Sequence, residues 1–371
     1  MNAVDVSILG SGPVAFSLGL ALARQGLRVA LPRVPPLAAA GDLRAYALNA
    51  AARTLLKSLK VWDALPADAV TPVYDMHVEG DGSDQTGGRL DFSAWQQGVE
   101  ALAWIVDAAE LDRALHTAAR FAPHLVLDSG DVKAALTVLA EGKDSAARDA
   151  LGVRFERHGY GQVAVAARLR ADKPHAGVAR QWFRSPDVLA LLPLDRPQPQ
   201  ASYALVWSLP GERAQALLQA DDAAFEQALA EATGGAAGRL ALASARAGWP
   251  LSIARAERLC GAGWVLVGDA AHVVHPLAGQ GLNLGLADVA TLARVIAGRE
   301  PWRRLSDEVL LRRYARERAL PTQAMARLTD GLLHLFATEQ PALRELRNRG
   351  MTLLNHFAPL KRLLTARALD A

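Results

Sequence analysis

A run of glycines with one carboxylate and two histidines, near residue 270, has the residue types that hold a cofactor. It reads Gly268-Asp269-Ala270-Ala271-His272 and, three residues later, Pro276-Leu277-Ala278-Gly279-Gln280-Gly281-Leu282-Asn283. The apolar segment 264–267 before it indicates a buried strand, and the apolar spacing of 284–297 predicts a helix. At such a turn a carboxylate can reach a sugar or polyol hydroxyl, while glycines leave backbone N–H groups open to an anionic ligand. The run therefore predicts a cofactor site, with an ordinary glycine-rich loop as the alternative.

A second pattern of this kind lies at the other end of the chain. An apolar run over 6–9 enters a G-x-G-x-x-A turn made by Gly10, Gly12 and Ala15, and a helical stretch over 16–25 follows. In this pattern the first glycine allows a tight turn, the second lets the backbone approach a pyrophosphate, and the small third residue lets helix and strand pack closely. With a second strand over 27–31, the segment predicts a β-α-β opening that binds a nucleotide.

One expected residue is absent from this opening. An acidic side chain after the second strand usually binds the ribose hydroxyls, but here the strand runs into Pro32-Arg33-Val34-Pro35-Pro36. The next carboxylate is Asp42. Arg33 could suit a phosphorylated ribose or could be a solvated loop residue, and the second interpretation is favoured.

Composition limits the classes of function. A chain of 371 residues with 51% hydrophobic content can bury a large core. The 41 basic and 38 acidic residues give a net charge of only +3 without a basic block, so nucleic-acid binding is not expected. Cys260 is the only cysteine, which excludes an internal disulfide and favours a small buried side chain in a cytosolic protein. No apolar run approaches the ~20 residues that a membrane span needs.

The order of the expected elements indicates two interleaved sheets. Helices are expected over 43–59, 109–121 and 221–232, and strands over 124–127 and 136–140. Short alternating stretches broken by glycines, typical of antiparallel strands, cover 73–95, 162–194 and 201–209, and the sequence past Pro301 is helical in pattern. The fold class is therefore α/β: a Rossmann-like nucleotide-binding module interleaved with an antiparallel-sheet substrate domain and followed by a C-terminal helical region.

These motifs together resemble a known family. The N-terminal turn, Arg44-Ala45-Tyr46-Ala47-Leu48-Asn49, the segment Glu141 to Arg148, the phrase 190–194 and above all GDAAHVVHPLAGQGLNLGLADV are similar to the FAD-dependent aromatic hydroxylases of the para-hydroxybenzoate-hydroxylase type. Within them the likeness is to the ubiquinone-biosynthesis hydroxylases, and the segments 311–318 and 346–350 share it. The likeness spans nearly the whole chain in four ordered motifs.

The resemblance implies FAD as the cofactor and assigns its contacts. The first glycine turn would hold the FAD pyrophosphate, Arg44 would reach the phosphates, and Asp269 would hold the ribityl chain. The loop after it would run along the isoalloxazine ring, where backbone amides stabilise negative charge. The implied cofactor-binding residues are Gly10, Gly12, Ala15, Arg44, Asp269, Pro276, Gly279, Gln280, Gly281, Leu282 and Asn283.

The implied reaction takes electrons from NADPH or NADH and one oxygen atom from O₂, and it hydroxylates the ring of a hydrophobic, polyprenylated phenol. The cofactor carries the oxygen chemistry, so no catalytic side chain is assigned. His272 and His275 could exchange protons near the flavin or suggest a metal, but structural roles are favoured and no metal is expected.

Three departures from the family pattern weaken the adenosine end of the site. The acidic residue after the second strand is missing, Glu141 replaces the family's aspartate, and Ala108 and Ala109 stand where relatives often carry polar groups. The connection 128–135 is also too short for the three-stranded meander of the family, so much of that meander must be absent.

The resemblance suggests boundaries, location and partners. The FAD-binding domain is expected over 1–71, 99–153 and 250–300, the substrate domain over 72–98 and 154–249, and the helical region over 301–371. The alternative to an enzyme is a degenerate paralogue that binds FAD weakly and acts as a scaffold in quinone biosynthesis. A cytoplasmic protein is expected, with peripheral contact to the inner membrane face through the apolar and basic tail 353–364 and a place in a ubiquinone-biosynthesis assembly.

Overall fold

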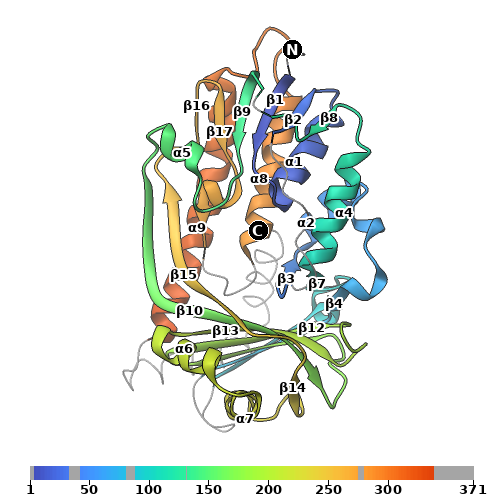
Figure 1. Ribbon diagram of the computed structural model, residues 1–371, viewed down its shortest axis with the longest axis vertical. Coiled ribbons are helices and arrows are strands. Elements are labelled where there is room, and N and C mark those ends of the chain that lie inside the picture. The colour runs from blue at the N-terminus through green and yellow to red at the C-terminus, as the bar shows by residue number, and fades with distance from the viewer. Residues whose placement is uncertain (1–3, 33–41, 81–87, 131, 275–279, 338–371) are drawn as a thin grey trace.

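The part of the chain that the structure describes contains three sheets, and Figure 1 shows the smallest of them between the two larger ones. The computed structural model describes residues 4–32, 42–80, 88–130, 132–274 and 280–337, with all their side chains except those of 280, 325–330 and 332–337. Within this part of the chain the arrangement is mixed α/β, as the sequence predicts. The division into domains at the residues given above stays a prediction.

The first sheet is the parallel layer that carries the glycine turns. Its strand order is β16-β17-β9-β1-β2-β8, and all its neighbours pair in parallel except β16 with β17. Its strands are β1 Val4–Leu9, β2 Val29–Leu31, β8 Leu125–Leu127, β9 Ala134–Leu139, β16 Cys260–Gly261 and β17 Trp264–Leu266. The connection from β8 to β9 contains no strand among its described residues, so the expected loss of the meander is confirmed there.

Helices with apolar faces cover this sheet and join its core. These are α1 Pro13–Ala23, α2 Ala50–Ser58, α4 Ala108–Arg120, α8 Gln280–Ala297 and α9 Glu308–Ala337, while α5 Ala146–Ala150 is a short helix after β9. The first helix begins at Pro13, earlier than expected, because proline suits the first helical position. The sequence past Pro301 is not helical at once, since α9 starts only at Glu308.

The large sheet has nine strands in the order β18-β15-β10-β13-β12-β11-β5-β6, with β14 paired to β10. Its pairs are antiparallel except that of β5 with β11. The strands are β5 Asp75–Glu79, β6 Arg89–Ser93, β10 Phe155–Ala171, β11 Val178–Arg184, β12 Asp187–Leu194, β13 Ser202–Pro210, β14 Leu240–Leu242, β15 Ala247–Ala256 and β18 His272–Val273. Helices α6 Gly211–Gln219 and α7 Asp222–Thr233 lie beyond it in Figure 1, and Ala214, Phe225 and Leu229 from these helices belong to the core under one of its faces.

The third sheet corrects one expectation from the sequence. Its strands are β3 Ala45–Leu48, β4 Val70–Val73 and β7 Ala103–Asp107, with the short helix α3 Ala94–Gln97 before β7. The expected helix over 43–59 is therefore wrong in its first part. Asn49 explains the boundary: its side chain accepts a hydrogen bond from the amide of Ala52 at 2.8 Å and caps α2, which leaves the alternating residues before it to pair with β7.

The two glycine motifs interlock where α1 crosses α8. Val14, at the start of α1, lies so close to Gly285 of α8 that a Cβ at Gly285 would stand 2.6 Å from the Val14 Cγ2 atom. The same valine lies against Gly268. The helix of the first motif thus packs directly on both parts of the second.

We expect Gly285→Ala to destabilise the cofactor-free protein by about 1–3 kcal/mol because the new methyl group overpacks this contact. Alanine elsewhere in a helix stabilises by about 0.5–1 kcal/mol relative to glycine, so the sign is diagnostic. Urea unfolding measures the change. Gly281→Ala in the same helix is the control, since its Cβ would meet no atom of the described residues within 4 Å. Adding Val14→Ala should restore most of the loss, and a Gly285→Ala protein as stable as the parent would contradict the packing argument.

Candidate functional site

The first glycine turn places a bare helix end at the carboxyl edge of the parallel sheet. Gly10 has φ +140°, and a Cβ there would stand 2.2 Å from the carbonyl oxygen of Ala140, so only glycine fits between the turn and the end of β9. Gly12 is the N-cap of α1, and among the described residues no side chain caps this helix and its first turn has no acidic residue. Ala15 is fully buried. The helix therefore presents free N–H groups and the positive end of its dipole, which suits a phosphate.

The second motif follows β17 as a short turn over Gly268–Ala270. The Asp269 side chain keeps accessible surface, yet protein encloses it enough that burial raises the pKa of its carboxyl, against the lowering effect of His272 and Lys143. A carboxyl that is accessible inside such surroundings can exchange hydrogen bonds with the hydroxyls of a ligand. This is the chemistry that a ribityl chain needs.

A buried carboxylate that the sequence argument missed holds this turn in place. Asp288 of α8 is fully buried, and its Oδ2 accepts hydrogen bonds from the Gly268 amide at 2.8 Å and from His272 Nε2 at 2.7 Å. Its Oδ1 accepts a hydrogen bond from Arg318 Nε of α9 at 2.6 Å. Burial alone would raise the pKa of Asp288, but His272, Arg318 and the Gly268 amide together lower it. The sequence held one sign of this buried carboxylate: Asp288 lies eight residues into the helix, on an otherwise apolar stretch.

This contact gives His272 a structural role. Its ring nitrogen is bonded to Asp288, and the side chain is buried. Within the described residues there is no group of three or more His, Cys, Asp or Glu side chains that could hold a metal ion. His275 lies outside the described residues.

Arg44 stands just before β3 with acidic neighbours. Its Nη2 is 2.6 Å from Asp42 Oδ2 and 3.8 Å from Asp112 Oδ2, and its guanidinium lies 5.8 Å from the ring centre of Tyr46. Burial would raise the pKa of Asp42, but Arg44 lowers it; burial raises the pKa of Asp112 to about 6. Burial also raises the pKa of Tyr46, and the charges of Asp112, Asp42 and Asp269 add to this effect. The Tyr46 hydroxyl is therefore influenced by charges of both the Arg44 cluster and the second motif.

In the segment after β9, Glu141 stands where the family resemblance implies an aspartate. Glu141 Oε2 accepts hydrogen bonds from Ser145 Oγ at 2.5 Å and from the Ala147 amide at 3.1 Å, so the longer side chain caps the start of α5. Ser145 adds a second cap through the amide of Arg148 at 3.1 Å.

Arg148 ties this segment to the second motif. Only 2% of the residue is exposed, and its Nη1 donates to the carbonyl oxygens of Lys143 at 3.2 Å and Ala270 at 3.3 Å. Its guanidinium also stacks 3.7 Å from the ring centre of Phe155. The carbonyl of Ala270, the residue after Asp269, is thus held by a second buried charge besides Asp288.

The start of α8 meets β3 through Asn283. Its Oδ1 accepts from the Asn49 amide at 3.0 Å and its Nδ2 donates to the Ala47 carbonyl at 2.8 Å, so this side chain links the second motif to the strand after Arg44. Leu282 is partly buried against the core, and a Cβ at Gly281 would meet no described atom within 4 Å. Two further residues assigned to the cofactor, Pro276 and Gly279, lie outside the described residues, as does the side chain of Gln280.

One face of the large sheet offers accessible apolar surface toward β3. Paired residues on neighbouring strands point to the same side, and Arg168 of β10 marks this side because it contacts the Arg44 carbonyl. The opposite face is closed by α6 and α7. On the side of Arg168 the register gathers mostly small or aliphatic side chains. Ala190, Leu192, Val206, Ala247 and, 41% exposed, Trp249 keep accessible surface, whereas Ala164, Ala166 and Ala204 are buried. We call these residues the apolar face.

Comparison with known proteins agrees with the geometry. The family model of the FAD binding domain matches residues 105–329. A ubiquinone hydroxylase UbiL from Rhodospirillum rubrum is 30% identical over 98% of this chain and 89% of its own length. The 3-demethoxyubiquinol 3-hydroxylase of Escherichia coli is 28% identical over 96% of both chains.

Solved structures agree on the fold. The probable FAD-dependent monooxygenase pqsL of Pseudomonas aeruginosa has a TM-score of 0.75 at 21% identity, covering 94% of this chain and 99% of its own. The p-nitrophenol 4-monooxygenase PnpA of Pseudomonas putida has a TM-score of 0.77 at 16% identity, covering 99% and 98%. None of the helices in the described part of the chain is long and apolar enough to cross a membrane.

The raised pKa of Asp112 predicts a pH dependence of stability. Its carboxyl binds its proton more tightly in the folded protein, so its contribution is favourable at low pH and is lost as the pH rises from about 4 to about 6. We expect Asp112→Asn, which stays neutral, to be more stable than the parent at pH 8 by about 1–3 kcal/mol. Urea unfolding of the cofactor-free proteins across pH 4–8 measures this difference. A difference that does not shrink toward pH 4 would contradict the assignment.

Proposed function

Because the chain belongs to the FAD-dependent monooxygenases that carry this FAD-binding domain, we propose that it hydroxylates the ring of a hydrophobic, polyprenylated phenol in ubiquinone biosynthesis. NADPH or NADH would supply the electrons and O₂ the oxygen atom. One observation carries the proposal: the bare N-terminus of α1 packs through Val14 on the turn that precedes Asp269, and Asn283 of α8 bonds to β3, the strand that follows Arg44. Arg168 of the large sheet bonds to the Arg44 carbonyl, so the sheet that carries the apolar face also reaches this strand. Near full-length likeness to named ubiquinone hydroxylases supports the substrate class.

The residues around the turns fit the parts of FAD. In this proposal Gly10, Gly12 and Ala15 form the place of the pyrophosphate, where free N–H groups and the helix dipole favour anions. Arg44 reaches the phosphates, and Asp269 bonds to the ribityl hydroxyls. The bound flavin supplies the oxygen chemistry.

The residues that begin α8 would run along the flavin ring. Gly281, Leu282 and Asn283 take this part in the proposal, together with Pro276, Gly279 and Gln280. Since Asn283 is bonded to Ala47 and Asn49, its contribution is to hold β3 against the start of α8.

The task left to the protein is to place the phenol and exclude water. The apolar face suits an uncharged ring with a prenyl tail, because small side chains leave room and hydrocarbon surface is favourably buried. We also propose contact with the membrane surface through the tail 353–364, which lies outside the described residues, and a place in a ubiquinone-biosynthesis assembly.

The competing proposal is a scaffold with weak FAD binding. Its support is that Asp42 already pairs with Arg44 and that no acidic residue follows β2 before that aspartate. The two proposals differ in a simple observable. An enzyme purified from an FAD-sufficient host is yellow with close to one flavin per chain, whereas a colourless protein that takes up no added FAD favours the scaffold.

The reaction itself is tested with the FAD-loaded protein, a prenylated phenol in detergent, and NADPH or NADH. We expect a product that has gained one oxygen atom, and label from isotopic O₂ should appear in it. Oxidation of NADPH or NADH with unchanged phenol would count against the proposed substrate class.

We expect Asp269→Ala to abolish retained flavin, because the ribityl hydroxyls lose their carboxylate partner. The flavin-to-protein ratio after purification measures this. Asp144→Ala is the control, since Asp144 is an exposed carboxylate in a nearby segment and pairs only with Arg157 among the ion pairs of the described residues. Unchanged FAD content in Asp269→Ala would show that the ribityl assignment is wrong.

We expect Ala190→Phe to lower turnover of the phenol at least about tenfold while the flavin is retained, because a large side chain fills the middle of the apolar face. A tenfold change corresponds to about 1.4 kcal/mol of lost transition-state binding. Ala223→Phe is the matched control, since Ala223 is exposed on α7, which covers the opposite face. Equal turnover in Ala190→Phe and the parent would move the substrate away from this face.

A further inference from the structure

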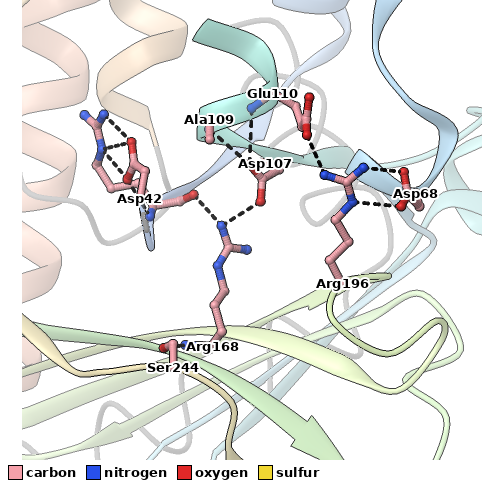
Figure 2. Close-up of polar contacts among 9 residues, drawn as sticks. Asp42, Asp68, Asp107, Ala109, Glu110, Arg168, Arg196 and Ser244 are labelled. Atoms are coloured by element: carbon pink, nitrogen blue, oxygen red, sulfur yellow. Dashed lines mark hydrogen bonds and ion pairs between the residues drawn. The ribbon is translucent and has the colours of Figure 1, made fainter. Parts of the chain in front are cut away.

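A buried cation crosses from the large sheet to the start of β3. Arg168 of β10 has a side chain only 9% exposed, and Figure 2 shows it rising from the sheet toward the strand and helix above. Its Nη2 donates to the Arg44 carbonyl oxygen at 2.7 Å and lies 3.0 Å from Asp107 Oδ2. Its neighbours on the same side of the sheet, Ala166 and Ala204, are small and apolar.

Stability alone does not explain a charge at this position. A buried ion pair loses so much hydration that apolar residues of similar volume often stabilise a protein equally or better. Burial lowers the pKa of Arg168 even though Asp107 and Asp42 oppose the shift. Its Nη1 atom is buried and has no hydrogen-bond partner among the described residues, which adds a further cost.

What the cation does hold is the backbone of Arg44. The Arg44 carbonyl oxygen accepts two hydrogen bonds, one from the Ala108 amide at 3.2 Å and one from Arg168. Asp107, the second partner of Arg168, is the N-cap of α4 and accepts from the amides of Ala109 at 3.0 Å and Glu110 at 3.2 Å. One guanidinium therefore fixes Arg44 and the start of α4 from the opposite sheet.

We propose that Arg168 is a positioning residue for the cofactor: by holding the Arg44 carbonyl and Asp107 it sets the place from which the Arg44 guanidinium binds the FAD phosphates. This rests on the role given to Arg44 in the proposed function. Arg168 itself touches no phosphate in this assignment. It acts through the main chain of Arg44.

A second arginine provides a control with the same architecture. Arg196 also reaches from the end of the large sheet, with Nη2 2.7 Å from Asp68 Oδ1 and Nη1 2.6 Å from Glu110 Oε1, as Figure 2 shows. It bridges to the same helix α4. Its hydrogen bonds among the described residues do not include Arg44 or Asp107.

The test measures FAD affinity of the full-length protein, stripped of flavin and titrated with FAD, together with the thermal midpoint of the flavin-free form. The variants are Arg168→Gln, Arg196→Gln, Arg44→Ala and the double variant Arg168→Gln/Arg44→Ala. We expect Arg168→Gln to raise the Kd for FAD about tenfold and Arg196→Gln to change it less than about twofold. In the Arg44→Ala background, Arg168→Gln should add less than about twofold, because coupled residues are not additive.

The last comparison separates positioning from a merely structural role. If Arg168 only supports the fold, its loss lowers the thermal midpoint and changes the Kd equally with and without Arg44, which overturns the inference. An unchanged Kd in Arg168→Gln overturns it too. If Arg44→Ala alone leaves the Kd for FAD unchanged, the phosphate role of Arg44 is wrong, and the inference that rests on it is wrong as well. A failure of the inference alone looks different, because Arg44→Ala then raises the Kd while Arg168→Gln does not.

Arg168→Lys keeps the test decisive if the glutamine variant does not fold. Lysine retains the charge but lacks the guanidinium fork, so it cannot reproduce both contacts in the same geometry. We expect a Kd between those of the parent and Arg44→Ala. A Kd equal to that of the parent, with a lowered thermal midpoint, would overturn the positioning role.

Discussion

The Asp288 carboxylate is the constraint on which the cofactor edge of the protein depends. It is fully buried, and it is compensated by a backbone amide, an imidazole and a guanidinium that come from three different segments. Removing any one of these leaves charge or polar surface uncompensated inside the core, where it is costly. The turn at Gly268, strand β18 and helix α9 are therefore held to α8 as one unit. Asp269 stands on that unit, so its position follows from a neighbour to which no ligand contact is assigned.

Close packing and ion pairs also join the layers of the protein. Parallel strands bring the ends of β1, β9 and β17 to one edge, and close packing at Gly10 and around Val14 leaves no freedom between the two glycine motifs. The large sheet is attached to this edge by charges as well as by apolar contact: Arg168 bonds to Arg44 and Asp107, and Arg196 bonds to Asp68 and Glu110. Since such pairs demand a defined geometry, they fix how the sheet that carries the apolar face meets the strand after Arg44.

Local signals made the parallel layer predictable from the sequence. The glycine spacing, the buried strand over 264–267 and the helical periodicity after 284 each depend on neighbours along the chain, and each is present in the structure. Strand β3 was missed because its four residues lie next to the helix α2, and only the cap at Asn49 separates the two. The Asp288 cluster and the Arg168 contacts could not be predicted, since they join residues 16 to 124 positions apart and nothing in the spacing of either partner reveals the other. Sequence reasoning found the groups that we propose as cofactor contacts more readily than the groups that hold them in place.

The charges around Arg44 decide how an anion could enter this edge. In the structure Arg44 is paired with Asp42, so a phosphate that binds Arg44 must take the place of a carboxylate. Leaving that carboxylate alone in a half-buried site would be unfavourable. Arg168, however, already acts on Asp42 and lowers its pKa, so the carboxylate keeps a cationic neighbour when Arg44 turns away. The raised pKa of Asp112 has the same effect. Because its carboxyl takes up a proton more readily than an ordinary aspartate, it can lose its negative charge when a phosphate binds nearby. The acidic surroundings of Arg44 thus allow an exchange of partners, and they do not exclude a phosphate.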